Sequence, residues 1–93
     1  MNTILVVGGD RIGDIENKLK ERGVTEIIHV SGRKGSDTKM KIPTSTNLVL
    51  VFTDFVNHTL SKHIKNQAKQ KNLPIVFCKR SYSAIGKVFQ AVN

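Results

Sequence analysis

The segment Thr3-Ile4-Leu5-Val6-Val7-Gly8-Gly9 indicates the fold class of this chain of 93 residues. A short apolar run that ends in glycine is typical of a buried parallel strand followed by a tight turn. Beyond the turn, Ile12, Ile15 and Leu19 recur at helical spacing, with acidic residues near the start and basic residues near the end. Because this charge pattern complements the helix dipole, it predicts a helix over about residues 11–22.

The remaining pattern predicts three more strands and two more helices. The strands are expected at Glu26–Val30, Leu48–Phe52 and Ile75–Cys78, and the helices at about Val56–Lys71 and 84–92. Right-handed crossovers favour the strand order 2-1-3-4. We therefore expect an α/β fold with a small doubly wound parallel four-strand sheet, truncated flavodoxin-like or Rossmann-like, and about three helices. The length predicts one α/β domain over residues 1–93.

Charge is unevenly distributed along this basic protein. Fifteen Lys and Arg against seven Asp and Glu give a net charge of +8. Residues 1–30 carry four basic and five acidic side chains, whereas residues 31–93 carry eleven basic and two acidic ones. A positive field over the later two thirds of the chain favours a nucleotide or nucleic acid as partner. The alternative is a solvated surface that serves only solubility.

Other features predict the cellular setting. The single cysteine, Cys78, excludes an intramolecular disulfide, and no secretory signal precedes the first strand, so we expect a cytoplasmic protein. No apolar run approaches the roughly 20 residues that span a bilayer, so we expect no membrane partner. Because a four-strand sheet leaves open edges around a small core, we also expect a homodimer.

Residues 31–47 stand where a doubly wound fold would place another helix, yet they have almost no periodic apolar face. Loops of this length are uncommon inside compact domains and usually act as lids or linkers. We therefore expect a lid over a ligand.

Polar groups follow all four predicted strands, although the strands are apolar. These segments are Gly8-Gly9-Asp10-Arg11, 29–34, 53–58 and Lys79-Arg80-Ser81. Ligands of open α/β sheets bind beyond the carboxyl ends of the strands. The glycine spacing does not fit a dinucleotide motif, but helix N-terminal amides together with Arg33 and Lys34 are suited to a phosphate. Alternatively, the glycines only permit a tight turn.

The titratable residues allow several interpretations. His29 and His58 lie near strand ends, where imidazole binds a metal, a proton or a phosphate, or makes a structural hydrogen bond. Asp54 either forms an acid/base pair with His58 or caps the following helix. For His63 and Cys78 we expect structural roles.

The strand ends also carry a family resemblance, through 6–12 (VVGGDRI), His29 before Ser31-Gly32, 53–58 (TDFVNH) and 77–81 (FCKRS). On these motifs nearly the whole chain resembles the bacterial domain of unknown function family 2325. The resemblance implies a cytoplasmic α/β fold, supplies no activity, and marks as family positions Gly9, His29, Asp54, His58, Lys65, Arg80 and Ser81. Many relatives end the second strand in two histidines, so a haem or metal site that needs both is not implied for this chain.

The leading hypothesis is a non-enzymatic binding module for a phosphate-bearing anionic ligand, a nucleotide or nucleic acid. One alternative is a haem- or metal-dependent sensor or carrier that uses His29 or His58, and another is a hydrolase or transferase that uses Asp54 and His58. The predicted ligand-binding residues are Gly8, Gly9, Asp10, Arg11, His29, Gly32, Arg33, Lys34, Asp54, His58, Lys65, Arg80 and Ser81.

The predicted site has a specific geometry. We expect His58, Lys65 and Arg80 to converge with Gly9, whereas Lys62 and Lys69 should face solvent. The few aromatic residues expected at the surface, Tyr82 and Phe55, argue against a stacking platform for single strands.

Overall fold

The chain folds around a parallel sheet. The computed structural model describes residues 3–32, 40–79 and 86. Four strands, β1 (Thr3–Val7), β2 (Glu26–Val30), β3 (Leu48–Phe52) and β4 (Ile75–Cys78), pair in the order β2-β1-β3-β4. Both the bounds of the strands and their order confirm the sequence prediction. All three strand pairs are parallel.

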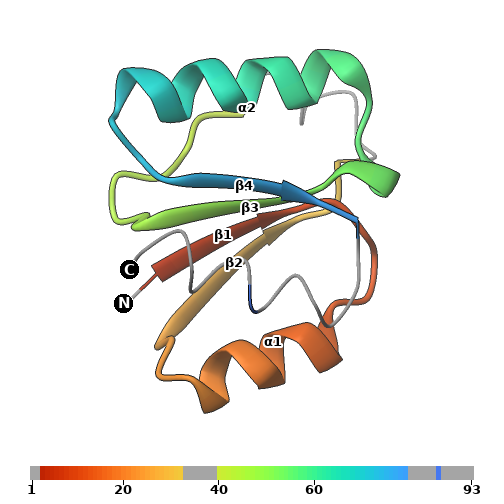
Figure 1. Ribbon diagram of the computed structural model, residues 1–93, viewed down its shortest axis with the longest axis vertical. Coiled ribbons are helices and arrows are strands. Elements are labelled where there is room, and N and C mark those ends of the chain that lie inside the picture. Colours follow the sequence, from red (N-terminus) through yellow and green to blue (C-terminus); the bar gives the residue numbers. More distant parts are fainter. Residues whose placement is uncertain (1–2, 33–39, 80–85, 87–93) are drawn as a thin grey trace.

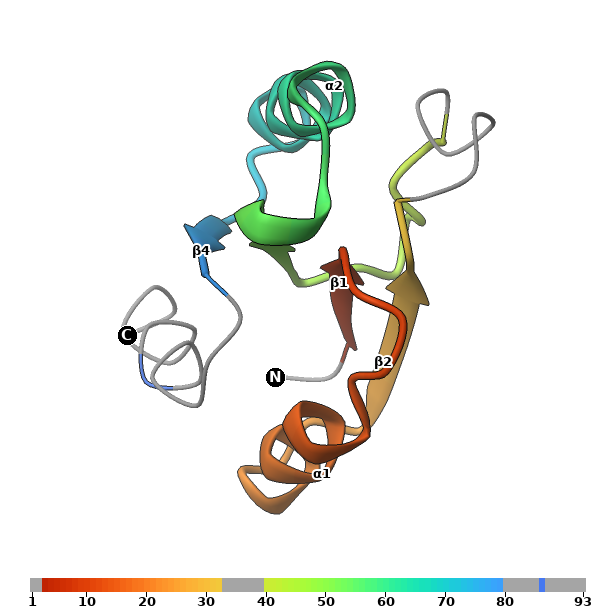
Figure 2. The ribbon, with the colours of Figure 1, turned by 90° about the vertical axis from the view of Figure 1, so that its right-hand side faces the viewer.

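Two helices cover opposite faces of the sheet (Figure 1). Helix α1 (Gly13–Glu21) lies on one face and α2 (His58–Gln70) on the other, as the end-on view also shows (Figure 2). Side chains alternate along β1, so that Ile4 and Val6 pack on the α1 side while Leu5 and Val7 pack on the α2 side. A sheet covered on both faces explains why the central strands are apolar throughout.

Helix α1 is shorter than predicted because Ile12 occupies the N-cap position and is buried. At the other end, the Gly23 amide donates to the Lys20 carbonyl at 3.0 Å and the Val24 amide donates to the Leu19 carbonyl at 3.2 Å. These two bonds form a Schellman motif, for which Gly23 adopts a φ of +98°. The predicted helix stop at this glycine is confirmed.

Helix α2 begins two residues later than predicted. A 3-10 turn, η2 (Thr53–Phe55), follows β3, and the Asn57 side chain caps α2 by accepting a hydrogen bond from the Leu60 amide at 2.8 Å. The expectation that Asp54 caps this helix is therefore wrong. Asn is among the best N-cap residues because its side-chain oxygen satisfies an otherwise unpaired amide of the first turn.

The described end of the long loop, residues 40–47, packs against the core and helix α2 and does not itself form a lid. Ile42 is 2% exposed and joins the core below α2. Gln67 holds the backbone on both sides of Lys41, since its Oε1 accepts from the Ile42 amide at 2.9 Å and its Nε2 donates to the Met40 carbonyl at 2.6 Å. His63 Nε2 lies 2.8 Å from the same carbonyl and from Gln67 Nε2, which confirms its structural role. Residues 33–39 lie outside the described residues.

Two other expectations concern the rest of the chain. The predicted helix over 84–92 lies outside the described residues, apart from Gly86, which is helical. Within the described residues, neither α-helix has the length and the apolar character needed to cross a membrane.

Candidate functional site

The space beside the glycines at the carboxyl edge of the sheet is filled by the protein itself. A Cβ atom on Gly8 would lie 2.9 Å from the Phe52 carbonyl oxygen and 3.2 Å from a methyl group of Val56. A Cβ atom on Gly32 would lie 3.1 Å from Leu60 and 3.3 Å from the same Val56 methyl group. Both glycines also have positive φ angles. At these two positions glycine is required for backbone conformation and close packing.

The turn between β1 and α1 also contains Gly9, Asp10 and Arg11. Gly9 is buried, and the Gly8 amide donates to the Val30 carbonyl at 2.8 Å. Asp10 and Arg11 are exposed and both have interaction partners. Because α1 starts only at Gly13, Gly9 lies outside its first turn, and a phosphate site at these glycines stays a prediction.

The two histidines proposed as alternative ligands lie apart. His29 pairs in register with Val6, so its side chain lies on the α1 side of the sheet, where Nε2 is 3.3 Å from the Gly8 carbonyl oxygen. His58 is the first residue of α2, on the opposite face. The structure therefore places the two histidines on different sides of the sheet. Coordination by a single histidine stays a prediction that an absorbance spectrum of the purified protein can test.

The other candidate groups are dispersed. Asp54 is exposed in η2, and within the described residues its carboxylate has no hydrogen bond or ion pair with His58. Cys78 is buried among the apolar side chains on the α1 side. The described residues contain no cluster of three or more metal-ligating side chains. Arg33, Lys34, Arg80 and Ser81 lie outside the described residues.

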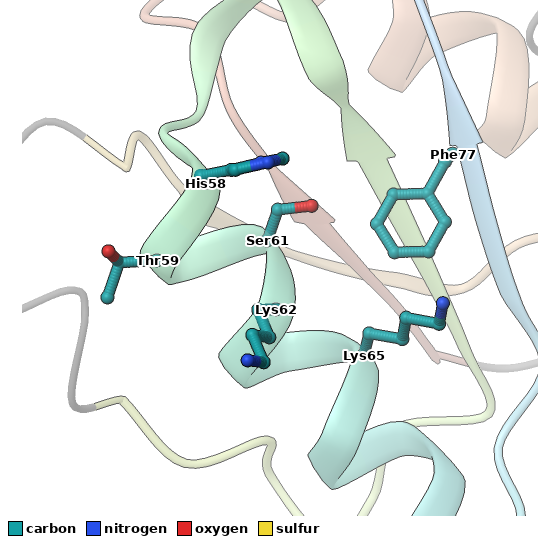
Figure 3. A pocket seen from close by; sticks show the side chains of 6 residues that line it. All are labelled: His58, Thr59, Ser61, Lys62, Lys65 and Phe77. Atoms are coloured by element: carbon teal, nitrogen blue, oxygen red, sulfur yellow. The ribbon is translucent and has the colours of Figure 1, made fainter.

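A pocket of about 630 Å³ opens between the N-terminal half of α2 and the edge strand β4 (Figure 3). In Figure 3, the His58, Ser61 and Lys65 side chains extend from α2 toward the space in front of Phe77 on β4. Of the predicted site residues, the structure thus brings together His58 and Lys65. The residues that line the pocket are His58, Thr59, Ser61, Lys62, Lys65 and Phe77.

Four of the lining residues were missed as site residues, namely Thr59, Ser61, Lys62 and Phe77. Lys62 was expected to face only solvent, but it lines the pocket. Phe77 was expected within the strand Ile75–Cys78 and was not named as a ligand-binding residue, yet β4 is an edge strand and leaves Phe77 half-buried. The predicted strand order already placed β4 at the edge, and that signal could have identified Phe77.

Comparison with known proteins gives a family and no further relative. No curated protein and no solved structure matches the chain. A family model described as "Uncharacterized protein conserved in bacteria (DUF2325)" matches residues 3–92. With nearly the whole chain matched, the protein belongs to the bacterial DUF2325 family.

Proposed function

We propose that the pocket between α2 and β4 binds a phosphate-bearing anionic ligand, and that the protein is a binding module rather than an enzyme. The observation that supports this most is the charge of the pocket wall. Lys62 and Lys65 both line it, and within the described residues neither ammonium group has a carboxylate partner. Ammonium groups that lack a protein counter-ion attract phosphate, which supplies several acceptor oxygens.

The size and lining of the pocket support a nucleotide as the ligand. A volume of about 630 Å³ lies within the range of small-molecule sites, roughly 300–1,000 Å³. Phe77 offers a flat apolar face, while Ser61 and His58 add hydrogen-bonding groups on the opposite wall. A nucleotide combines a flat base with a charged phosphate and so matches both halves of this lining.

Calorimetric titration with AMP, ADP and ATP tests the proposal. Lys65→Ala should weaken binding by about tenfold to hundredfold, because a hydrogen bond to a charged group contributes about 1.5–3 kcal/mol. Lys20→Ala is the matched control, since Lys20 is an exposed lysine on α1, on the other face of the sheet. An equal loss in both variants would show that only net charge matters, and absence of binding to all three nucleotides would refute the proposal.

A further inference from the structure

The cationic side of α2 is longer than the pocket. His58, Lys62, Lys65 and Lys69 follow one another at helical spacings of four, three and four residues. At about 100° per residue they lie within a stripe roughly 60° wide, and at about 1.5 Å per residue the stripe is about 16 Å long. We call these four residues the α2 row. Its first three members line the pocket, and Lys69 lies one turn beyond it.

The α2 row has no counter-charge on its own helix. Helix α2 contains no Asp or Glu, and within the described part of the chain no ion pair involves any of the four residues. The three lysines of the row carry charge of one sign along one helix face and repel one another, which raises the free energy of the unbound protein. A ligand with several regularly spaced negative charges relieves that repulsion along the whole row, whereas a mononucleotide reaches only the part at the pocket.

Phe77 supplies the second element of the site, and it was not among the surface aromatic residues whose scarcity argued against a stacking platform. In Figure 3 its ring lies across the pocket from His58 and Lys65, two members of the α2 row, and it is the aromatic residue of the lining. Proteins that bind single-stranded nucleic acid combine a positive groove, which follows the backbone, with aromatic rings on which bases stack. A duplex keeps its bases paired and stacked, so that no base face is free to meet Phe77.

We infer that the site takes a single-stranded nucleic acid, with one base against Phe77 and the neighbouring phosphates along the α2 row. This inference rests on the proposed function and extends it from a nucleotide to a strand. A row about 16 Å long spans the phosphates of a few consecutive nucleotides of one strand. One aromatic ring can stack on only one base of the strand, so we expect affinity to depend weakly on base sequence.

Fluorescence anisotropy tests the inference with labelled oligo-dT and oligo-rU of about ten nucleotides. Each strand should bind at least about tenfold more tightly than its mononucleotide, with a log–log salt slope of about −0.7 per lysine contact. Lys69→Ala should reduce that slope by about 0.7 while leaving mononucleotide affinity unchanged. Phe77→Leu should weaken both strands at every salt concentration, and Lys20→Ala should change neither. The tighter of the two strands identifies the polymer.

Three results would overturn the inference in distinguishable ways. If mononucleotide and strand bind equally and Lys69→Ala has no effect, the strand inference fails and the nucleotide pocket stands. If a duplex of the same length binds as tightly as the strand, and Phe77→Leu binds like wild type, base stacking plays no part. Binding of neither nucleotides nor strands would remove the proposed function as well. A denaturant unfolding curve for each variant shows whether it is folded.

Discussion

Helices α1 and α2 are built alike where they touch the sheet and differently where they face solvent. Each buries a short apolar stripe, Ile15 and Leu19 on α1 and Leu60, Ile64 and Ala68 on α2. Each also ends in a Schellman motif. In α2, Asn72 takes the positive φ position that Gly23 takes in α1, and the Leu73 amide donates to the Ala68 carbonyl at 2.8 Å.

The charged faces of the two helices show the difference. Helix α1 carries three acidic and two basic residues, and it pairs Lys20 with Glu16 at 3.1 Å and Lys18 with Glu21 at 3.6 Å. Helix α2 carries three lysines and no acidic residue. Since the fold depends on the buried stripes, the solvent face of each helix can vary with little effect on stability. Folding therefore does not require the lysine charge on α2, which we propose serves to bind the ligand.

The largest expected effect is on stability and concerns the buried apolar stripe that both helices share. Leu19→Ala and Leu60→Ala each remove a fully buried side chain, one below each helix. Each should lower the free energy of unfolding by about 2–5 kcal/mol through lost burial and the cavity left behind. Denaturant unfolding followed by circular dichroism measures both. A loss below about 1 kcal/mol in either variant would mean that its helix is not anchored as the structure shows.

An intermediate effect is expected when α2 is given the charge pattern of α1. Asn66→Glu places a carboxylate four residues after Lys62 and three before Lys69, which are spacings at which side chains on a helix can pair. Oligonucleotide affinity at low salt should fall about tenfold, while the free energy of unfolding changes by less than about 0.5 kcal/mol. Anisotropy titration measures the affinity, and Asn66→Gln is the neutral control. Unchanged affinity in Asn66→Glu would place the ligand away from the α2 row.

The smallest effect is expected on α1. Glu16→Gln removes the partner of Lys20 from an exposed pair, which contributes only about 0.3–0.5 kcal/mol. Thermal unfolding at low and high salt should show a slight loss that disappears with salt, and oligonucleotide affinity should not change. A gain in affinity would show that any unpaired lysine attracts the ligand, and the distinction between the two helices would then have no functional meaning.

Sequence patterns predicted most of the fold and a small part of the site. The strand bounds followed from apolar runs such as Leu48–Phe52, because burial on both faces removes polar residues from a strand. Helix ends were less accurate, since Ile12 and Asn57 take capping positions that depend on local packing. Of the pocket residues, His58 and Lys65 were named in advance, the latter through the family resemblance alone.

The amino-acid sequence specifies the parallel sheet and its order because both depend on local periodicity and on the handedness of crossovers. It also specifies the excess of positive charge. Only the tertiary structure shows that Gly8 and Gly32 make room for Val56. In the sequence, a glycine that packs against a side chain cannot be distinguished from one that leaves space for a phosphate. Only the tertiary structure brings Phe77 opposite Lys65, because strand order and helix docking set that contact between separate elements.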